Sequence, residues 1–364
     1  MHDDGHLRSQ LEPQESLNLP PLSEIHSLRI PTIVHIPKAA RPEFARLLAD
    51  ELESLSSSPA LVSLWSRVLL IAKTILSVNC LQGSREEGRS QAAIIKERIK
   101  RWRKGDIVSL LNEAKTGKNR RQRGKRKRAT EIPTQEEMNL RRAKKFIAEG
   151  QYSRASEALG SQGLAEVNEE TVNEMKQKHP QAPVPRLAPL PDAQPLKLTT
   201  DQIRKSLKSF KKGSAPGLSG LRAEHLKASI NSGSPVVQDR VISAVTKFGN
   251  VLLAGMVPKA VSPFFYGARL HGAKKKDGTL RPIAVGEVLR RLASKCAMSV
   301  IKEKAVSLLS PLQLGVGVPG GCETVVHVVQ ALLNEKNDDL AVVQVDYVNA
   351  FNLADRATAF KEVQ

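Results

Sequence analysis

The sequence predicts an α+β fold, in which a mostly helical N-terminal region is followed by a mixed region of helices, a β-hairpin and a strand. Two observations carry this prediction. Apolar residues recur at the three- and four-residue spacing of amphipathic helices through much of 38–178. Further along, two short apolar runs flank Asp277-Gly278, a dipeptide typical of hairpin turns, and a third apolar run ends at Asp346.

The N-terminal helices follow from apolar spacing and from the positions of proline and glycine. One helix is predicted through 44–55, entered at Pro37 and Pro42, and a second over 61–76. Between 143 and 159 the same spacing, interrupted at Gly150, predicts a helical hairpin.

Two segments have the composition of linkers. Lys118–Arg128 contains eight Lys or Arg in eleven residues, so it repels itself and is expected to be disordered. Residues 179–195 contain six prolines, which exclude a helix interior and favour extended backbone. The predicted organisation is an N-terminal extension (1–37), a helical region (38–114), a basic disordered linker (115–135), a helical hairpin (136–178), a Pro-rich linker (179–198) and a C-terminal domain (199–364).

The C-terminal domain is expected to alternate helices with short strands. A helix capped by Thr199 or Thr200 ends in a Gly/Pro turn, and the two strands of the hairpin are separated by a lysine-rich turn. The predicted elements are helix 199–210, turn 211–217, strands 264–270 and 280–285, helix 287–309, glycine-rich turn 315–321, helix 325–333 and buried strand 341–345.

The charge balance points to a polyanionic partner. The chain of 364 residues has a formal net charge of +19. Residues 91–130 alone carry fifteen basic and three acidic side chains, a net of +12. The most apolar stretch, 60–81, is interrupted by Arg67 and Lys73, so we expect no membrane-spanning helix, which requires roughly 18 uncharged residues.

The N-terminus and the cysteines predict an intracellular protein, in the nucleus or the cytoplasm. The chain opens on polar and acidic residues, whereas a secretory signal requires positive charge and then an apolar run. Cys80, Cys296 and Cys322 lie far apart in sequence, which favours neither a disulfide framework nor a zinc cluster.

Asp346 is the first candidate for chemistry. It follows an apolar run directly, and its carboxylate, together with the backbone carbonyl of Tyr347, could supply part of an octahedral Mg²⁺ site. An Asp in this position is also a common turn former or helix cap, so the residue alone leaves both interpretations open.

Three motifs in order surround this residue. They are Gly213-x-Ala215-Pro216-Gly217-x-x-Gly220-Leu221, Lys275-Lys276-Asp277-Gly278-x-x-Arg281-Pro282-Ile283 and Asp346-x-x-x-Ala350-Phe351-Asn352. Together they resemble the fingers and early palm of a non-LTR (LINE-type) retrotransposon reverse transcriptase. Further segments that resemble this family are 290–295 and 313–317, and segments 30–32, 35–38 and 150–152 resemble the region that precedes its polymerase domain.

The resemblance implies that 199–364 is a partial reverse transcriptase domain, comprising fingers and the start of the palm, and that the chain is a fragment of an RNA-directed DNA polymerase. Its partners would be an RNA template, a DNA primer and deoxynucleoside triphosphates. Asp346 would be the first catalytic aspartate, binding Mg²⁺ with the carbonyl of Tyr347. In such enzymes two metal ions activate the primer hydroxyl and neutralise the leaving pyrophosphate.

The same resemblance assigns roles to other residues. Phe351 would exclude a ribose 2′-hydroxyl, although it could instead be a core aromatic. Arg281, with Lys275 or Lys276, would contact the triphosphate, Arg as a bidentate fork and Lys as a point charge. The nucleic-acid contacts would include Gly217 and Gly220, which allow close approach of a template or, alternatively, simply adopt a loop conformation.

One departure from the family limits the expected activity. Such polymerases need further palm carboxylates, and the chain ends at Gln364, eighteen residues after Asp346. We therefore expect no polymerisation by this polypeptide alone.

Two other functions are consistent with the sequence. The basic block 96–128 could make the chain a non-enzymatic RNA- or DNA-binding protein, or serve as a nuclear-import signal or solvated linker. Its candidate nucleic-acid contacts are Arg120, Arg121, Arg123, Lys125, Arg126, Lys127 and Arg128. As a minor alternative, Gly315-x-Gly317-x-x-Gly320 before a helix, with Asp346 as a ribose contact, has the outline of a dinucleotide-binding fold over 315–346.

Overall fold

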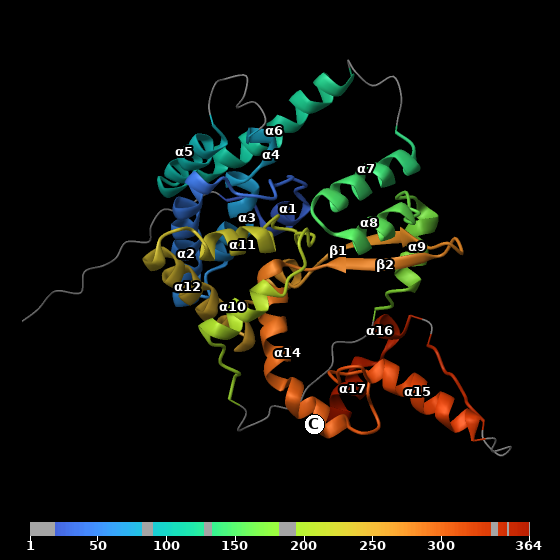
Figure 1. Cartoon of the computed structure of the whole chain (residues 1–364). Coiled ribbons are helices and arrows are strands. Elements are labelled where there is room, and N and C mark those ends of the chain that lie inside the picture. Colours follow the sequence, from blue (N-terminus) through green and yellow to red (C-terminus); the bar gives the residue numbers. More distant parts are fainter. Residues whose placement is uncertain are drawn as a thin grey trace, which may run out of the picture. The chain divides into compact units, whose positions relative to one another are not determined.

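A computed structural model describes residues 19–81, 90–126, 133–181, 194–335, 341–347 and 349–363, with the backbone alone for 117–126, 351 and 363. The described chain is mostly helical and contains one two-stranded antiparallel sheet, so the α+β prediction is confirmed at this level (Figure 1). The chain forms two compact units. Unit 1 comprises 1–126, 207–267 and 287–289, and unit 2 comprises 127–206, 268–286 and 290–364.

Unit 1 is a helical assembly in which the central contact is between helices distant in sequence. Its helices are α1 (Leu22–Ser27), η1 (Lys38–Ala40), α2 (Arg41–Ser57), α3 (Val62–Ile75), α4 (Val78–Leu81), α5 (Gln91–Arg103), α6 (Ile107–Arg126), α11 (Ala223–Ile230), α12 (Pro235–Leu253) and α13 (Ser262–Phe265). The two long helices α2 and α12 pack against each other, and both bury apolar residues, among them Phe44 and Leu48 of α2 and Val241 and Val245 of α12. Burial of these apolar residues supplies the main stabilisation of the unit.

An aromatic cluster closes one part of this core. The ring centroid of Trp65 lies 5.7 Å from that of Phe248 and 5.1 Å from that of Phe265, and these two phenylalanines are 5.9 Å apart. These separations fall in the range preferred by edge-to-face aromatic pairs. Because Phe265 is drawn into the cluster, Ser262–Phe265 forms the short helix α13 in place of the beginning of the predicted strand 264–270.

The predicted N-terminal extension is part of this core over its described residues. Ile25, Ile30 and Ile36 are buried, and the buried ammonium of Lys73 donates to the carbonyl oxygen of Ile25 at 2.6 Å. Residues 19–37 therefore belong to the folded unit, and position 37 is not a structural boundary.

The basic segment also differs from the prediction. Helix α6 begins at Ile107 and continues to Arg126, so 115–126 is helical where a disordered linker was predicted. Buried Ile107, Leu110, Leu111 and Ala114 hold its first half. Lys, Arg and Gln have good helix propensity, so the polar half can extend a helix that packing has already nucleated. Residues 127–132 of the predicted linker, and 182–193 of the Pro-rich linker, lie outside the described residues.

Unit 2 contains the helical hairpin, the β-hairpin and the C-terminal helices. Its elements are α7 (Gln135–Ala148), α8 (Tyr152–Leu159), α9 (Glu169–Gln177), most of α10 (Thr200–Lys208), β1 (Arg269–Lys274), β2 (Leu280–Val285), most of α14 (Val288–Leu309), α15 (Gly321–Asn334), α16 (Ala350–Leu353) and α17 (Arg356–Val363). The predicted helical hairpin is confirmed, with a small core of Ala143, Ala155 and Ala158 against Phe146.

The predicted β-hairpin is also confirmed, with the second strand at its predicted bounds. The register pairs Arg269 with Val285 and Lys274 with Leu280. Residues 163–165 run along the free edge of β1, where the amide of Ala165 donates to the carbonyl of Gly272 and the amide of Lys274 donates to the carbonyl of Gly163. Part of the open edge of the sheet is thereby satisfied.

The predicted buried strand 341–345 is not formed. Residues 341–347 are exposed and have no strand partner among the described residues. A strand needs a hydrogen-bonded neighbour for its backbone groups, and apolar alternation alone cannot supply one. A dinucleotide-binding motif requires a strand immediately before its glycine-rich turn. In this structure helix α14 precedes that turn and runs to Leu309, so the motif is not in the required structural setting.

The predicted C-terminal domain 199–364 does not correspond to one compact unit. Its residues 207–267 and 287–289 pack with the N-terminal helices, and the remainder belongs to unit 2. The apolar face of α12 finds its complement on α2, nearly two hundred residues earlier, and contacts at that separation leave no local signal in the sequence.

Candidate functional site

The lysine-rich turn of the β-hairpin is rigidly built. The amide of Gly278 donates to the carbonyl of Lys275, and Gly278 adopts a φ of +82°, which favours glycine. The carboxylate of Asp277 accepts from the amide and the hydroxyl of Thr279, at 2.9 and 2.7 Å. These hydrogen bonds lower the pKa of the Asp277 carboxyl. The turn thus holds Lys275 and Lys276 on an exposed tip.

Arg281 lies on one face of the same hairpin. Leu280 is buried and faces α9, and successive residues of a strand point to opposite faces, so Arg281 points away from α9. Arg281 is paired with Ala273, which places it on the same face as His271 and Arg269. Its side chain is exposed. The structure therefore combines a cationic tip with a cationic face on a single two-stranded element.

Helix α9 fixes the other face of the hairpin. The ammonium of Lys178, the residue after α9, donates to the Glu174 carboxylate and to the carbonyl of Leu280, both at 2.6 Å. Glu174 in turn accepts from the amide of Leu280 at 3.0 Å. The contact with Lys178 is the main cause of a lowered pKa of the Glu174 carboxyl. These bonds anchor β2 immediately beside Arg281.

The segment that carries Asp346 is joined to the same anchor. The side-chain amide of Asn349 donates to the backbone carbonyl of Lys178 at 2.7 Å, and Asn349 itself has a φ of +55°. The amide of Asn352 donates to the Asn349 side chain at 2.7 Å. Lys178 therefore links the Arg281 motif to the Asp346 motif, although the two are 65 residues apart in sequence.

Asp346 and Tyr347 are both exposed, and Tyr347 retains 75% of its accessible surface. The carboxylate of Asp346 forms no ion pair with Arg281 in the parts of the chain that the structure describes. The side chain of Phe351 lies outside the described atoms, so its predicted role as a gate stays a prediction. Only its backbone is placed, in α16.

The fit of Mg²⁺ can be judged from the donor set. Asp346 and the carbonyl of Tyr347 offer two of the six or so oxygen ligands that such an ion requires. Among the described residues no group of three or more His, Cys, Asp or Glu side chains gathers at one place. The described residues do not by themselves form a magnesium site.

Gly217 and Gly220 are accounted for by internal packing. A Cβ atom added to Gly217 would lie 2.6 Å from the Cα of Glu287, and one added to Gly220 would lie 2.8 Å from a methyl carbon of Thr32. Gly220 is buried and has a φ of +77°. Close approach is required at both positions, and in this structure the approaching group is the protein itself.

Glu287 holds this glycine-containing loop. Its carboxylate accepts from the amide of Ser219 at 2.7 Å and from the hydroxyl of Ser219 at 2.5 Å. Glu287 is buried, and burial raises the pKa of its carboxyl, while the hydrogen bonds from Ser219 oppose this effect. The arrangement is a structural clamp on the loop within unit 1.

The basic block divides into two parts with different environments. Most cations over 96–115 are paired within unit 1: Lys96 with Glu43, Arg98 and Arg101 with Glu113, Arg101 with Asp106, Arg103 with Asp50 and Lys115 with Glu24.

The predicted nucleic-acid contacts Arg120, Arg121, Arg123, Lys125 and Arg126 follow on the same helix, and their side chains are not described. Lys127 and Arg128 lie outside the described residues. Most cations of the block whose side chains the structure describes are therefore already engaged in ion pairs.

Sequence reasoning missed the residues that support the hairpin. Glu174, Lys178 and Asn349 all act through contacts with backbone groups distant in sequence. A Lys four residues after a Glu does signal an ion pair on one helix face, but the pattern carries no information about Leu280.

No family model, curated protein or solved structure matches this chain. Within the described residues, none of the helices has both the length and the apolar character needed to cross a bilayer.

Proposed function

We propose that this chain is part of an RNA-directed DNA polymerase of the non-LTR retrotransposon type, and that its β-hairpin contacts the incoming triphosphate. One observation carries this proposal. Lys275, Lys276 and Arg281, which the sequence motif groups, lie exposed on one hairpin whose opposite face is anchored by α9.

The chemistry of these groups suits phosphate oxygens. A guanidinium can donate two parallel hydrogen bonds to a phosphate, whereas lysines contribute point charges on flexible stems. The carboxylate of Asp277 is hydrogen-bonded by Thr279 within the turn, and it also interacts electrostatically with Lys275, so it offsets part of the charge of that lysine. A rigid turn also reduces the entropy lost when its side chains engage a ligand.

Photo-crosslinking of 4-thio-dTTP to the full chain, with poly(rA)·oligo(dT) and Mg²⁺ present, tests the proposal. We expect crosslinked peptides from 274–285 and about a tenfold or greater loss of crosslinking in Arg281→Ala, because a hydrogen bond to a charged group is lost. Lys275→Ala with Lys276→Ala should have a smaller effect.

Matched controls are available on exposed helical positions. Arg46→Ala and Lys247→Ala remove one cation each from α2 and α12 and should leave crosslinking unchanged. Crosslinking that is equal in Arg281→Ala and wild type, or that maps outside the hairpin, would contradict the proposal.

A second candidate function is non-enzymatic binding of RNA or DNA by the basic end of α6. The observation that favours it is the continuation of this basic helix to Arg126. A basic helix presents its charges to phosphates without base stacking, so such binding would be poorly selective for sequence. It would persist in Arg281→Ala, which distinguishes the two functions.

A further inference from the structure

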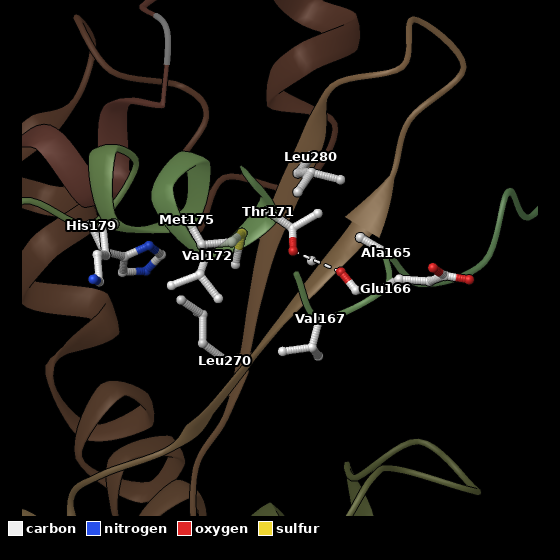
Figure 2. A pocket seen from close by; sticks show the side chains of 11 residues that line it. Ala165, Glu166, Val167, Thr171, Val172, Met175, His179, Leu270 and Leu280 are labelled. Carbon is white, nitrogen blue, oxygen red and sulfur yellow. Dashed lines mark hydrogen bonds between the residues drawn. The ribbon is translucent and has the colours of Figure 1, made fainter. Parts of the chain in front are cut away.

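A cavity lies between α9, the segment 165–167 and the β-hairpin, entirely within unit 2 (Figure 2). Its volume is about 300 Å³. The hollow exists in part because Gly272 carries no side chain: a Cβ added there would approach Leu280, Met175 and Ala165 at 3.3 to 3.6 Å. This volume is at the lower end of the range for sites that bind small molecules.

The walls are mainly aliphatic, and several of their side chains are incompletely covered. Met175 and Leu280 form the buried part of the lining, with 9% and 5% exposure. Val167, Val172 and Leu270 also line the cavity and remain 91%, 39% and 36% exposed. Covering these surfaces with an apolar ligand would release the water in contact with them, which favours binding.

One polar side chain at the end of the cavity lacks a partner. His179 lines the cavity, and Figure 2 shows its imidazole at the end opposite Glu166. Nδ1 of this ring is buried and has no hydrogen-bond partner among the residues that the structure describes. A buried polar atom without a partner costs free energy that a ligand could recover.

We propose that this cavity binds a small, neutral, mainly apolar molecule that carries a hydroxyl group, and that the hydroxyl bonds to the imidazole of His179. A hydroxyl suits this position because it both donates and accepts, so it can pair with a ring nitrogen in either tautomer. Most of the lining is aliphatic, so burying a charged ligand there would cost more free energy than burying a neutral one. This site does not depend on the function proposed for the opposite face of the hairpin.

Binding of 2-naphthol and of 2-methylnaphthalene to the full chain tests the site, because the two probes differ in a hydroxyl in place of a methyl group. Ligand-observed NMR titration should show saturable binding of both, with 2-naphthol about threefold to tenfold tighter. In His179→Phe this preference should disappear while 2-methylnaphthalene still binds.

A blocking variant separates the cavity from unspecific binding. Val172→Phe adds bulk at a partly exposed position of the lining and should weaken both probes at least tenfold. Val236→Phe, at an exposed valine of α12 outside the cavity, should bind both probes as wild type does. If 2-naphthol fails to saturate, or if Val172→Phe binds it like wild type while circular dichroism shows a native helix content, the proposal is wrong.

Discussion

Asn349 and Lys178 are joined by a hydrogen bond of 2.7 Å from the side-chain amide of one to the backbone carbonyl of the other. The ammonium of the same lysine bonds to the carbonyl of Leu280 in β2. A residue at the end of α9 therefore positions both segments that carry the proposed polymerase motifs. Neither motif contacts the other directly through these bonds, so the common support at Lys178 is what relates them.

Removal of this support should loosen β2. We expect Lys178→Met to increase amide hydrogen exchange of residues 280–285 by about threefold to tenfold, because the charge-assisted bond to Leu280 is lost while the bond from Leu280 to Glu174 remains. Mass spectrometry of deuterated peptides measures the change. Lys176→Met alters an exposed lysine of the same helix and should leave exchange in β2 unaffected; equal rates in the two variants would show that Lys178 does not support the strand.

Gly217 should tolerate no side chain. An added Cβ would lie 2.6 Å from a backbone atom of Glu287, so we expect Gly217→Ala to lower the free energy of unfolding of unit 1 by about 1–3 kcal/mol. Urea denaturation followed by tryptophan fluorescence is the appropriate measurement, because both tryptophans, Trp65 and Trp102, are buried in this unit. Ala215→Ser, at an exposed position of the same loop, should change stability by less than about 0.5 kcal/mol. A neutral Gly217→Ala would mean that the loop can move away from Glu287.

The stability of unit 1 should depend on the protonation of His225. Its Nδ1 accepts from the amide of Arg222, and its Nε2 donates to the carbonyl of Ile33 at 2.7 Å, so the ring is neutral in the fold. Burial lowers the pKa of His225 from 6.5 to about 4. The unfolded chain therefore binds a proton that the folded chain does not, and stability should fall as the pH decreases from about 6.5 to about 4, by on the order of 3 kcal/mol.

The variant His225→Leu isolates the contribution of this histidine to the pH dependence of stability. The pKa of Glu287 is raised, so its titration affects stability with the opposite sign, and the two effects overlap in the wild type. Urea denaturation at pH 7, 5.5 and 4.5 should show a shallower decrease for His225→Leu than for the wild type. Parallel pH profiles would contradict a neutral buried His225.

The basic end of α6 should determine the salt dependence of nucleic-acid binding. Replacing Arg120, Arg121, Arg123 and Lys125 by Gln should reduce the slope of log K against log salt on single strands by about 3 in magnitude, because each phosphate contact contributes about 0.7. Fluorescence anisotropy of a labelled oligonucleotide between low and moderate salt measures the slope. A control variant with Arg120→Lys, Arg121→Lys and Arg123→Lys, in which Lys125 is unchanged, keeps the charge and should retain the wild-type slope; an unchanged slope in the Gln variant would place the contacts elsewhere.

Local pattern was sufficient for the elements that are defined by their own residues. The β-hairpin was predictable because Asp277-Gly278 dictates the turn and the flanking apolar runs supply the strands, and β2 occupies its predicted bounds. Helices α2, α3, α7, α8 and α14 follow from apolar spacing in the same way. The segment 341–345 shows the limit of this reasoning, because its pattern is that of a strand and yet no described neighbour completes its hydrogen bonds.

Amino-acid order therefore specified turns, helix faces and the grouping of Lys275, Lys276 and Arg281, all of which depend on residues within one or two turns of chain. Tertiary contacts decided that α12 packs on α2, that Glu287 clamps the loop at Ser219, and that Lys178 supports both Leu280 and Asn349. The physical reason is that backbone carbonyls and amides are the same at every position, so a hydrogen bond to a distant main chain is selected by packing geometry and leaves no mark in the sequence.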